Sequence, residues 1–475
     1  MHATIARTWR RVGTQQHEQE YGFMEKVYRR VSVPAGQAGR FLLGTHVQFH
    51  TTRQGGVDEL AAAFRRAWIQ IRHECPDIAC LPAKRGKTYT SLDTPGELET
   101  WVSRTFVVIH DRSALDLWQG LTKTNQVTLY YLTKTNHLFL QTEHYHLDGR
   151  GMLRFWNLFF TALITPAEPR LDGSEVGRLQ PRPLDIVDLH GISDESAGRL
   201  ADEIMQPLAA RTAARIKMPN ASSLTPAGGG GRGGRPPAGN SYEETKLGAG
   251  LSEAIVASCK GRKLSITGVW HAALVFATRD EQLAANEGVG STYVGLANFD
   301  LRTHYPDGGE KAKAKARAAA AYPFGDHHCV LPMALAIEGK DISDAASELT
   351  NFYWHRLADS KPDIWAALPV IAEKLTPALT TERPTDSTPS AASLGLVDSY
   401  IDHSYGGEWT INDFWAGNTV AGPSIKCFIY TWKGRLILNS CYNSDCYSRE
   451  TLSRFHARIV QWILRALDLM WEEYV

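Results

Sequence analysis

Residues 143–149 read Glu143-His144-Tyr145-His146-Leu147-Asp148-Gly149 and lie between a strand hairpin and an apolar helix. The segments 126–132 and 137–142 are rich in Val, Thr, Leu, Phe and Tyr and flank a Thr-Lys-Thr-Asn turn, which predicts two paired strands. Residues 152–164 follow as a strongly apolar helix. His144 is therefore expected where a strand leaves its sheet. Asp148 is expected at the N-cap of the next helix, where a carboxylate accepts backbone N–H groups.

This placement points to base catalysis by His144. Histidine is the side chain most easily poised near neutral pH to take a proton from a hydroxyl or an amine. Asp148 lies four residues later, close enough to brace the turn that aims the imidazole. The spacing alone leaves a second interpretation open, which is a buried histidine beside an ordinary capping aspartate.

The sequence His144-x-x-x-Asp148-Gly149 resembles the HxxxDG signature of the chloramphenicol-acetyltransferase-like (CAT-like) superfamily. That group includes BAHD acyltransferases, fungal trichothecene O-acetyltransferases and the condensation domains of peptide synthetases. The spacing selects His144 and not His146, since only His144 lies four residues before Asp148. Condensation domains have another histidine directly before the active one. This chain has Glu143 there, which argues against a peptide-synthetase module.

Three later segments resemble the superfamily in the expected order. Residues 298–302 resemble the region whose arginine pairs with the aspartate of the motif. Residues 393–398 resemble the strand that crosses toward the active site, and residues 412–417 resemble a degraded form of the BAHD motif DFGWG. Residues 71–80 also resemble the N-terminal helix exit of fungal acetyltransferases. Overall the chain resembles the trichothecene 15-O-acetyltransferase type, except in its glycine-rich middle.

A chain of 475 residues suits two domains or subdomains. The resemblance implies an α/β (α+β) fold of two CAT-like subdomains, each a mixed β-sheet flanked by helices, with the active-site channel between them. The expected divisions are an N-terminal subdomain over 1–215, a flexible crossover linker over 216–245, and a C-terminal subdomain over 246–475. The glycine-rich stretch 228–237 cannot bury enough apolar surface to offset its ordering entropy. No Lys-Ser or Lys-Thr follows it, which argues against a phosphate-binding loop.

Composition narrows the class of protein. The 51 basic and 51 acidic residues give a formal net charge of zero and no electrostatic reason to expect nucleic acid or an anionic membrane as a partner. The seven cysteines are an odd number without a CxxC pair, which argues against a disulfide scaffold and a structural zinc site. There is no secretory leader pattern and no apolar run of about 18 residues. A cytoplasmic enzyme is expected. A monomer is expected because one chain carries both halves of the site.

The resemblance implies a catalytic set of His144, Asp148, Gly149 and Arg302. In it Arg302 pairs with Asp148 across the two halves of the chain, and an arginine–carboxylate fork holds Asp148 as an organiser and not as a proton relay. Taken alone, Arg302 could equally be a solvated surface residue. The predicted substrate-binding residues are Tyr145, His146, Ser393, Trp409, Asn412, Phe414 and Trp415. Thr410, Ser393 and Asn412 are alternative donors to an oxyanion. Trp409, Phe414 and Trp415 are core or pocket wall.

Two further sequence patterns suggest a function but have simpler structural interpretations. Asp326-His327-His328-Cys329 spells the label of the palmitoyltransferases, but the cysteine-rich domain and membrane spans of that family are missing from the sequence. His327 and His328 are therefore predicted as loop residues. The basic residues of an alanine-rich run could neutralise the phosphates of coenzyme A, although a solvated helix face is favoured. They are Lys311, Lys313, Lys315 and Arg317.

The predicted function is acyl-CoA-dependent O-acyltransfer, with acetyl-CoA as co-substrate, no permanently bound cofactor and no metal. The acceptor is a small-molecule alcohol of secondary metabolism such as a terpenoid, and His144 is the general base. A serine hydrolase is disfavoured because no Gly-x-Ser-x-Gly is present. Two alternatives stay open. One is a condensation-like enzyme that makes an amide or cyclises an intermediate without acyl-CoA, and the other is an inactive binding module of the same fold.

Overall fold

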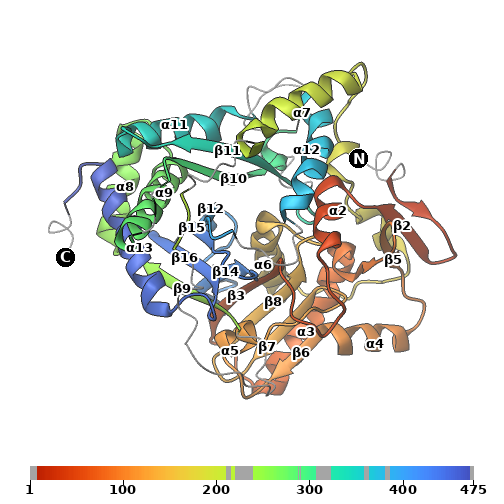
Figure 1. Cartoon of the computed structure of the whole chain (residues 1–475). Coiled ribbons are helices and arrows are strands. Elements are labelled where there is room, and N and C mark those ends of the chain that lie inside the picture. The colour runs from red at the N-terminus through yellow and green to blue at the C-terminus, as the bar shows by residue number, and fades with distance from the viewer. Residues whose placement is uncertain are drawn as a thin grey trace, which may run out of the picture. The chain divides into compact units, whose positions relative to one another are not determined.

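The computed structural model describes residues 8–209, 216–219, 239–286, 288, 290–305, 322–357, 363–379 and 386–470, and Figure 1 labels its helices and strands. The chain divides into two compact units. Unit 1 consists of Met1–His190, Asp300–Cys329 and Val397–Asn418, and unit 2 of Gly191–Phe299, Val330–Leu396 and Thr419–Val475. The predicted boundaries 1–215, 216–245 and 246–475 stay a prediction. Most of that linker lies outside the described residues, as do Lys311, Lys313, Lys315 and Arg317.

Unit 1 is built on a six-stranded mixed sheet in the order β13-β14-β3-β8-β7-β6. Its strands are β13 Ser404–Tyr405, β14 Trp409–Asn418, β3 Leu42–Thr51, β8 His137–Glu143, β7 Thr128–Leu132 and β6 Phe106–Ile109. Strands β7 and β8 pair antiparallel, which confirms the predicted hairpin, whereas β6 pairs parallel to β7. Strand β14 pairs antiparallel with β3, so a strand from late in the chain completes a sheet that begins early.

Among the described residues, unit 1 also contains a small sheet, α-helices and several short 3₁₀ helices. The sheet has the order β1-β2-β5-β4, with β1 Arg10–Arg11, β2 Gln16–Glu20, β5 Gly86–Thr90 and β4 Leu81–Pro82. The helices are α2 Phe23–Arg30, α3 Val57–Glu74, α4 Pro95–Thr105, α5 Ala114–Gln119 and α6 Gly149–Ile164.

Two expectations for unit 1 change at the ends of helices. Helix α6 begins at Gly149, three residues before the predicted start, because Asp148 caps it through the backbone N–H of Gly151. The β-branched residues Val31 and Val33 favour a short strand over 31–33, but that segment is turn and coil after α2. Helix α2 has only eight residues, too few for a periodic pattern to stand out in the sequence.

Unit 2 contains a four-stranded sheet and a two-stranded sheet, of orders β12-β15-β16-β9 and β10-β11. The strands are β12 Ser390–Leu396, β15 Lys426–Trp432, β16 Arg435–Asn443, β9 Asn240–Lys246, β10 Thr292–Asp300 and β11 His328–Ala336. The helices are α7 Asp194–Ala209, α8 Ala249–Gly261, α9 Ile266–Ala284, α11 Ile342–His355, α12 Asp363–Leu379 and α13 Arg449–Ala466. The last residue of β10, Asp300, and the first residue of β11, His328, belong to unit 1. Helix α9 supplies much of the buried core of unit 2.

The strand expected from the segment 393–398 begins earlier in the chain than the resemblance indicates. Strand β12 runs over Ser390–Leu396 and pairs parallel with β15. The segment is rich in Ser and Ala, and its pairing partner, not its own propensity, makes it a strand.

The predicted α/β (α+β) class is confirmed, since mixed sheets and helices make up both units. Among the described residues, no helix is both long and apolar enough to span a bilayer.

Candidate active site

His144 directly follows strand β8. The strand ends at Glu143, and His144 opens the turn that follows, with its backbone N–H donating to the carbonyl of Phe41 at 3.2 Å. Glu143 is buried and fixes the end of the strand. It accepts a hydrogen bond from Ser32 and lies 3.2 Å from Lys123 Nζ. The backbone that carries His144 is therefore held on both sides.

Asp148 fixes the other end of the turn. Its Oδ1 accepts the N–H of Gly151 at 2.8 Å. Its Oδ2 accepts from Arg302 Nη1 at 2.7 Å and from the N–H of His327 at 2.8 Å. Burial by itself raises the pKa of Asp148, but the Arg302 guanidinium outweighs burial and holds that pKa well below its usual range. The predicted pair of Asp148 and Arg302 is thus present. The expectation that it joins two halves is wrong, because the segment that carries Arg302 belongs to unit 1 together with Asp148.

Arg302 is 1% exposed, and its remaining N–H groups meet acceptors. Nε donates to the carbonyl of Tyr322 at 2.6 Å, and Nη2 lies 3.3 Å from the carbonyls of both Phe324 and Gly325. Nη1 also lies 3.2 Å from Asp300. A buried arginine with this many partners escapes the penalty of an unsatisfied charge. It ties the segments that end at Asp300 and begin at Tyr322 to the HxxxDG turn.

Gly325 brings the third segment against the turn. Its carbonyl accepts the N–H of Asp148 at 3.3 Å, and Leu147 and Gly325 form an isolated parallel bridge. Gly325 has φ +83°, a left-handed backbone that favours glycine, and a Cβ there would lie 3.2 Å from the ring of His327. The site is therefore assembled from the end of β8 with the start of α6, the segment 300–305 and the segment 322–328.

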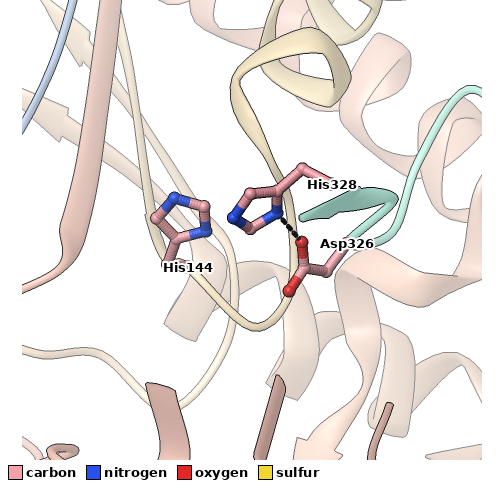
Figure 2. A group of neighbouring side chains, drawn as sticks. All are labelled: His144, Asp326 and His328. Carbon is pink, nitrogen blue, oxygen red and sulfur yellow. Dashed lines mark hydrogen bonds and ion pairs between the residues drawn. The ribbon is translucent and has the colours of Figure 1, made fainter. Parts of the chain in front are cut away.

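The imidazole of His144 is half-buried among aromatic rings. The ring of Tyr28, from α2, stacks on it with centroids 4.1 Å apart and an interplanar angle of 13°. The ring of His328 lies 4.8 Å away at 32°. Figure 2 shows His328 between His144 and the carboxylate of Asp326, to which His328 is hydrogen-bonded. A half-buried imidazole on a locked turn can accept a proton from a substrate hydroxyl.

The whole chain is similar to proteins of known structure. It resembles the solved structure of TRI3, the trichothecene 15-O-acetyltransferase of Fusarium sporotrichioides, with a TM-score of 0.78 and 16% identity over 97% of this chain and 98% of that chain. The chain has the CAT-like acetyltransferase fold. The resemblance inferred from the HxxxDG motif and its companions is confirmed.

Two curated relatives of this chain come from Monascus ruber. Acetyltransferase pigO is 25% identical over 459 residues, which are 93% of this chain and 94% of the relative. O-acetyltransferase pigM is 22% identical over 479 residues, which are 97% of this chain and 88% of the relative. No protein-family model matches the chain. The prediction of an acyltransferase is confirmed at this level, because the relatives and the structural neighbour are acetyltransferases.

The neighbours of His144 in the CAT-like motif point into the interior of unit 1. Tyr145 is 0% exposed, with the Arg29 guanidinium 5.0 Å over its ring, and His146 is 4% exposed. Burial lowers the pKa of His146 well below its ordinary value, so its imidazole is neutral. Gly149 is the first residue of α6. The substrate-binding roles of Tyr145 and His146 stay predictions, and the structure places both among core residues.

The aromatic candidates of the degraded DFGWG segment lie on β14 and are almost fully buried. Trp409 packs against Phe49 and Phe64, with centroids 5.8 and 5.5 Å away, and Phe414 is 0% exposed. Trp415 packs against His46, among others. These positions are core positions of unit 1, and a pocket-wall role for them stays a prediction.

The polar candidates are spread over both units. Asn412 is exposed on β14 at the bulge between Ile411 and Asp413, and Thr410 is half-buried beside it. Ser393 lies on β12 in unit 2, where Thr267 Oγ1 donates to its hydroxyl at 3.0 Å. The structure does not bring these three residues together with His144 within one unit, and their oxyanion roles stay predictions.

Sequence reasoning missed the residues that surround the His144 ring. The segment predicted as a loop around His327 and His328 is buried, with Asp326 5% and His328 7% exposed, and β11 begins at His328. The loop prediction is therefore wrong for His328. The adjacent Asp326, His327 and His328 are a sequence signal for a polar site. The sequence does not show that they lie close to His144. Nothing in the sequence links Tyr28 to this site.

Proposed function

We propose that this chain transfers an acyl group, most simply acetyl, from acyl-CoA to the hydroxyl of a secondary-metabolite alcohol such as a terpenoid. The observation that carries the proposal is His144, half-buried on a turn whose far end is locked by the Asp148–Arg302 pair. The CAT-like fold and the acetyltransferase relatives supply the reaction class. TRI3 is by name a trichothecene 15-O-acetyltransferase, which supports an alcohol as the acceptor.

In the proposed reaction His144 removes the proton of the acceptor hydroxyl as that oxygen attacks the thioester carbonyl. The carbon–oxygen bond forms, and a hydrogen-bond donor stabilises the tetrahedral oxyanion. The carbon–sulfur bond then breaks, and the protonated His144 returns the proton to the departing thiolate. Atoms and charge balance without a metal or a covalent acyl-enzyme.

Asp148 is proposed as an organiser and not as a proton carrier. Its carboxylate already accepts three hydrogen bonds, and Arg302 keeps its pKa low. A carboxylate in that state is a poor proton acceptor at neutral pH. Ser393, Thr410 and Asn412 remain candidate oxyanion donors, and the predicted channel for donor and acceptor stays a prediction.

The test is an assay of product formation with acetyl-CoA and a panel of metabolite alcohols. His144→Ala is expected to lower kcat by roughly 10²- to 10⁴-fold, the usual contribution of a general base. Its melting temperature should stay close to that of the wild type, since the ring is only half-buried. The matched control is His110→Ala, an exposed histidine that should leave turnover unchanged.

Two outcomes would contradict the proposal. Full turnover by His144→Ala would remove the general base. Conversion of a biosynthetic intermediate without binding of acetyl-CoA, measured by calorimetry, would favour amide formation or cyclisation instead.

A further inference from the structure

The contacts of Asp148 fix the turn that carries His144, but they do not fix the orientation of the His144 ring. The two carboxylate oxygens of Asp148 accept hydrogen bonds from Gly151, Arg302 and His327. These contacts fix the turn and the neighbouring segments. A general base also needs its ring held at a defined angle, because a misplacement of about 1 Å can lower a rate by on the order of 100-fold. The groups that contact the ring of His144 therefore determine how firmly that angle is held.

Tyr28 covers one face of the His144 ring. The stack is close and nearly parallel, and Tyr28 is itself buried at 7% exposure. Its ring also packs on Phe41, with centroids 5.4 Å apart. Phe41 has φ +60°, an unfavourable backbone for a bulky residue, and its carbonyl accepts the N–H of His144. Tyr28 and Phe41 thus hold the ring and the backbone of the same histidine.

A hydrogen-bonded chain fixes Tyr28 in turn. The Tyr28 hydroxyl lies 2.9 Å from Nε2 of His328, and Nδ1 of His328 is bonded to Oδ1 of Asp326. A carboxylate accepts from the Nδ1–H, which leaves Nε2 of a neutral imidazole to accept from the Tyr28 hydroxyl. Burial raises the pKa of Tyr28 well above its ordinary value, so the hydroxyl keeps the proton that it donates. These three residues belong to unit 1, as does His144.

The same residues invite a metal-site interpretation, which the geometry disfavours. Possible ligand atoms of His144, Asp326 and His328 lie within 4.8 Å of one another. Two ligands of one tetrahedral zinc ion stand about 3.4 Å apart at ordinary bond lengths. Asp326 and His328 are instead in direct hydrogen-bond contact, and Nε2 of His328 is engaged with Tyr28.

We infer that Tyr28, His328 and Asp326 are positioning residues that orient the imidazole of His144. The inference rests on the proposed role of His144 as the general base. Asp326 sets the tautomer and angle of His328, His328 anchors the Tyr28 hydroxyl, and the Tyr28 ring fixes the plane of His144. Burial raises the pKa of Asp326 to about 6, and the neighbouring His328 opposes that shift.

Steady-state kinetics test the positioning role. Tyr28→Leu removes the stacked ring and should lower kcat by on the order of 100-fold while changing KM for acetyl-CoA by less than about 3-fold. Tyr28→Phe keeps the ring and loses the anchor, so its kcat should lie between those of Tyr28→Leu and the wild type. Asp326→Asn should match Tyr28→Phe in kcat. The control Tyr130→Phe loses a hydroxyl bonded to Gln141 elsewhere in unit 1 and should leave kcat unchanged.

A measurement that needs no acyltransfer separates this inference from the proposed function. Diethyl pyrocarbonate modifies accessible imidazoles, and peptide mass spectrometry reports the rate at each histidine. Removing the Tyr28 ring should raise the rate at His144 several-fold relative to the exposed His110. Tyr28→Phe, which preserves the packing, should leave that rate near the wild-type value and keeps the test valid if Tyr28→Leu folds poorly.

Three results would overturn the inference. They are wild-type kcat in both Tyr28 variants, unchanged modification of His144 in Tyr28→Leu, and stoichiometric zinc binding by the wild type that Asp326→Asn abolishes. If His144→Ala is fully active while the modification rate still responds to Tyr28→Leu, the proposed function fails and the positioning geometry stands.

Discussion

At the scale of single residues, the Asp148–Arg302 pair does two things at once. It caps α6 through Asp148 and fastens the segment 322–325 through the other guanidinium hydrogen bonds. Buried pairs of this kind add little net stability by themselves, but breaking one leaves a charge without a partner. The pair therefore specifies the shape of the turn more than it strengthens the fold.

Asp148→Asn should lower the free energy of unfolding by about 3 kcal/mol, the penalty of leaving Arg302 buried without its counter-charge. Because the folded pKa of Asp148 lies below its unfolded value of about 3.9, the stabilising contribution is present above that pH and is lost as the pH falls through the folded pKa. Urea denaturation at pH 7 measures the first effect.

The control for this variant is the exposed pair of Arg199 and Glu195 on α7. Glu195→Gln should change the free energy of unfolding by less than about 0.5 kcal/mol, because water screens exposed charges. Equal losses in both variants would show that the buried pair has no special role.

The sequence predicted the residues of the site that follow one another along the chain. His144 and Asp148 were recognisable because their spacing is local, and Arg302 because a known motif resembles its surroundings. Tyr28 and His328 were not, since a side chain from α2 and another from the start of β11 meet His144 only through tertiary packing. Contacts between residues this far apart in sequence leave no periodic trace.

At the scale of elements, the packing of α9 on α11 depends on a single missing side chain. A Cβ at Gly268 would lie 2.3 Å from Thr350 Oγ1 and 2.7 Å from the backbone nitrogen of Thr350. The backbone of α11 cannot yield as the tip of a flexible side chain would. The two helices approach this closely only because residue 268 is glycine.

Gly268→Ala should therefore destabilise the protein by about 1–3 kcal/mol, the usual penalty of overpacking. Alanine's better helix propensity, worth about 1 kcal/mol, offsets only part of this. Thermal unfolding followed by circular dichroism measures the shift.

The matched control is Gly198→Ala in α7, where nothing lies within 4 Å of the added carbon. There the propensity gain acts alone, so the melting temperature should hold or rise. A stable Gly268→Ala would mean that α9 and α11 tolerate separation.

Elements were predictable where local pattern and tertiary environment agree. The hairpin β7–β8 and the apolar helix α6 carry clear sequence patterns and were predicted. Helix α12 was not, because Pro369 and Pro377 interrupt the pattern that would reveal it. Strand β12 was misplaced because its position comes from pairing with β15.

At the scale of the whole molecule, buried histidines make stability depend on pH. Burial lowers the pKa of His271 to about 3 and of His456 to about 4, and both lie in unit 2. Each ring is hydrogen-bonded to hydroxyl groups inside the unit, as with Ser440 and His456 at 2.8 Å. Both are neutral in the folded protein at pH 5.

Stability should fall as the pH drops from about 6.5 toward 4, because the unfolded chain then takes up protons that the folded chain excludes. His456 alone accounts for about 3 kcal/mol of that loss if its folded pKa is about 4. Chemical denaturation at several pH values gives the slope.

His456→Gln should make that slope shallower, whereas the exposed His190→Gln should leave it unchanged. An identical slope in wild type and His456→Gln would show that the buried imidazole does not titrate in this window.

The pairing of β14 with β3 has a consequence for biosynthesis. A ribosome releases β3 long before it has translated residues 409–418, so the nascent polypeptide carries an open backbone edge through most of its synthesis. Such an edge is a template for joining other chains. A premature stop codon between residues 303 and 409 would make that exposure permanent, and the truncated product should be recovered in inclusion bodies even though it contains His144 and Arg302.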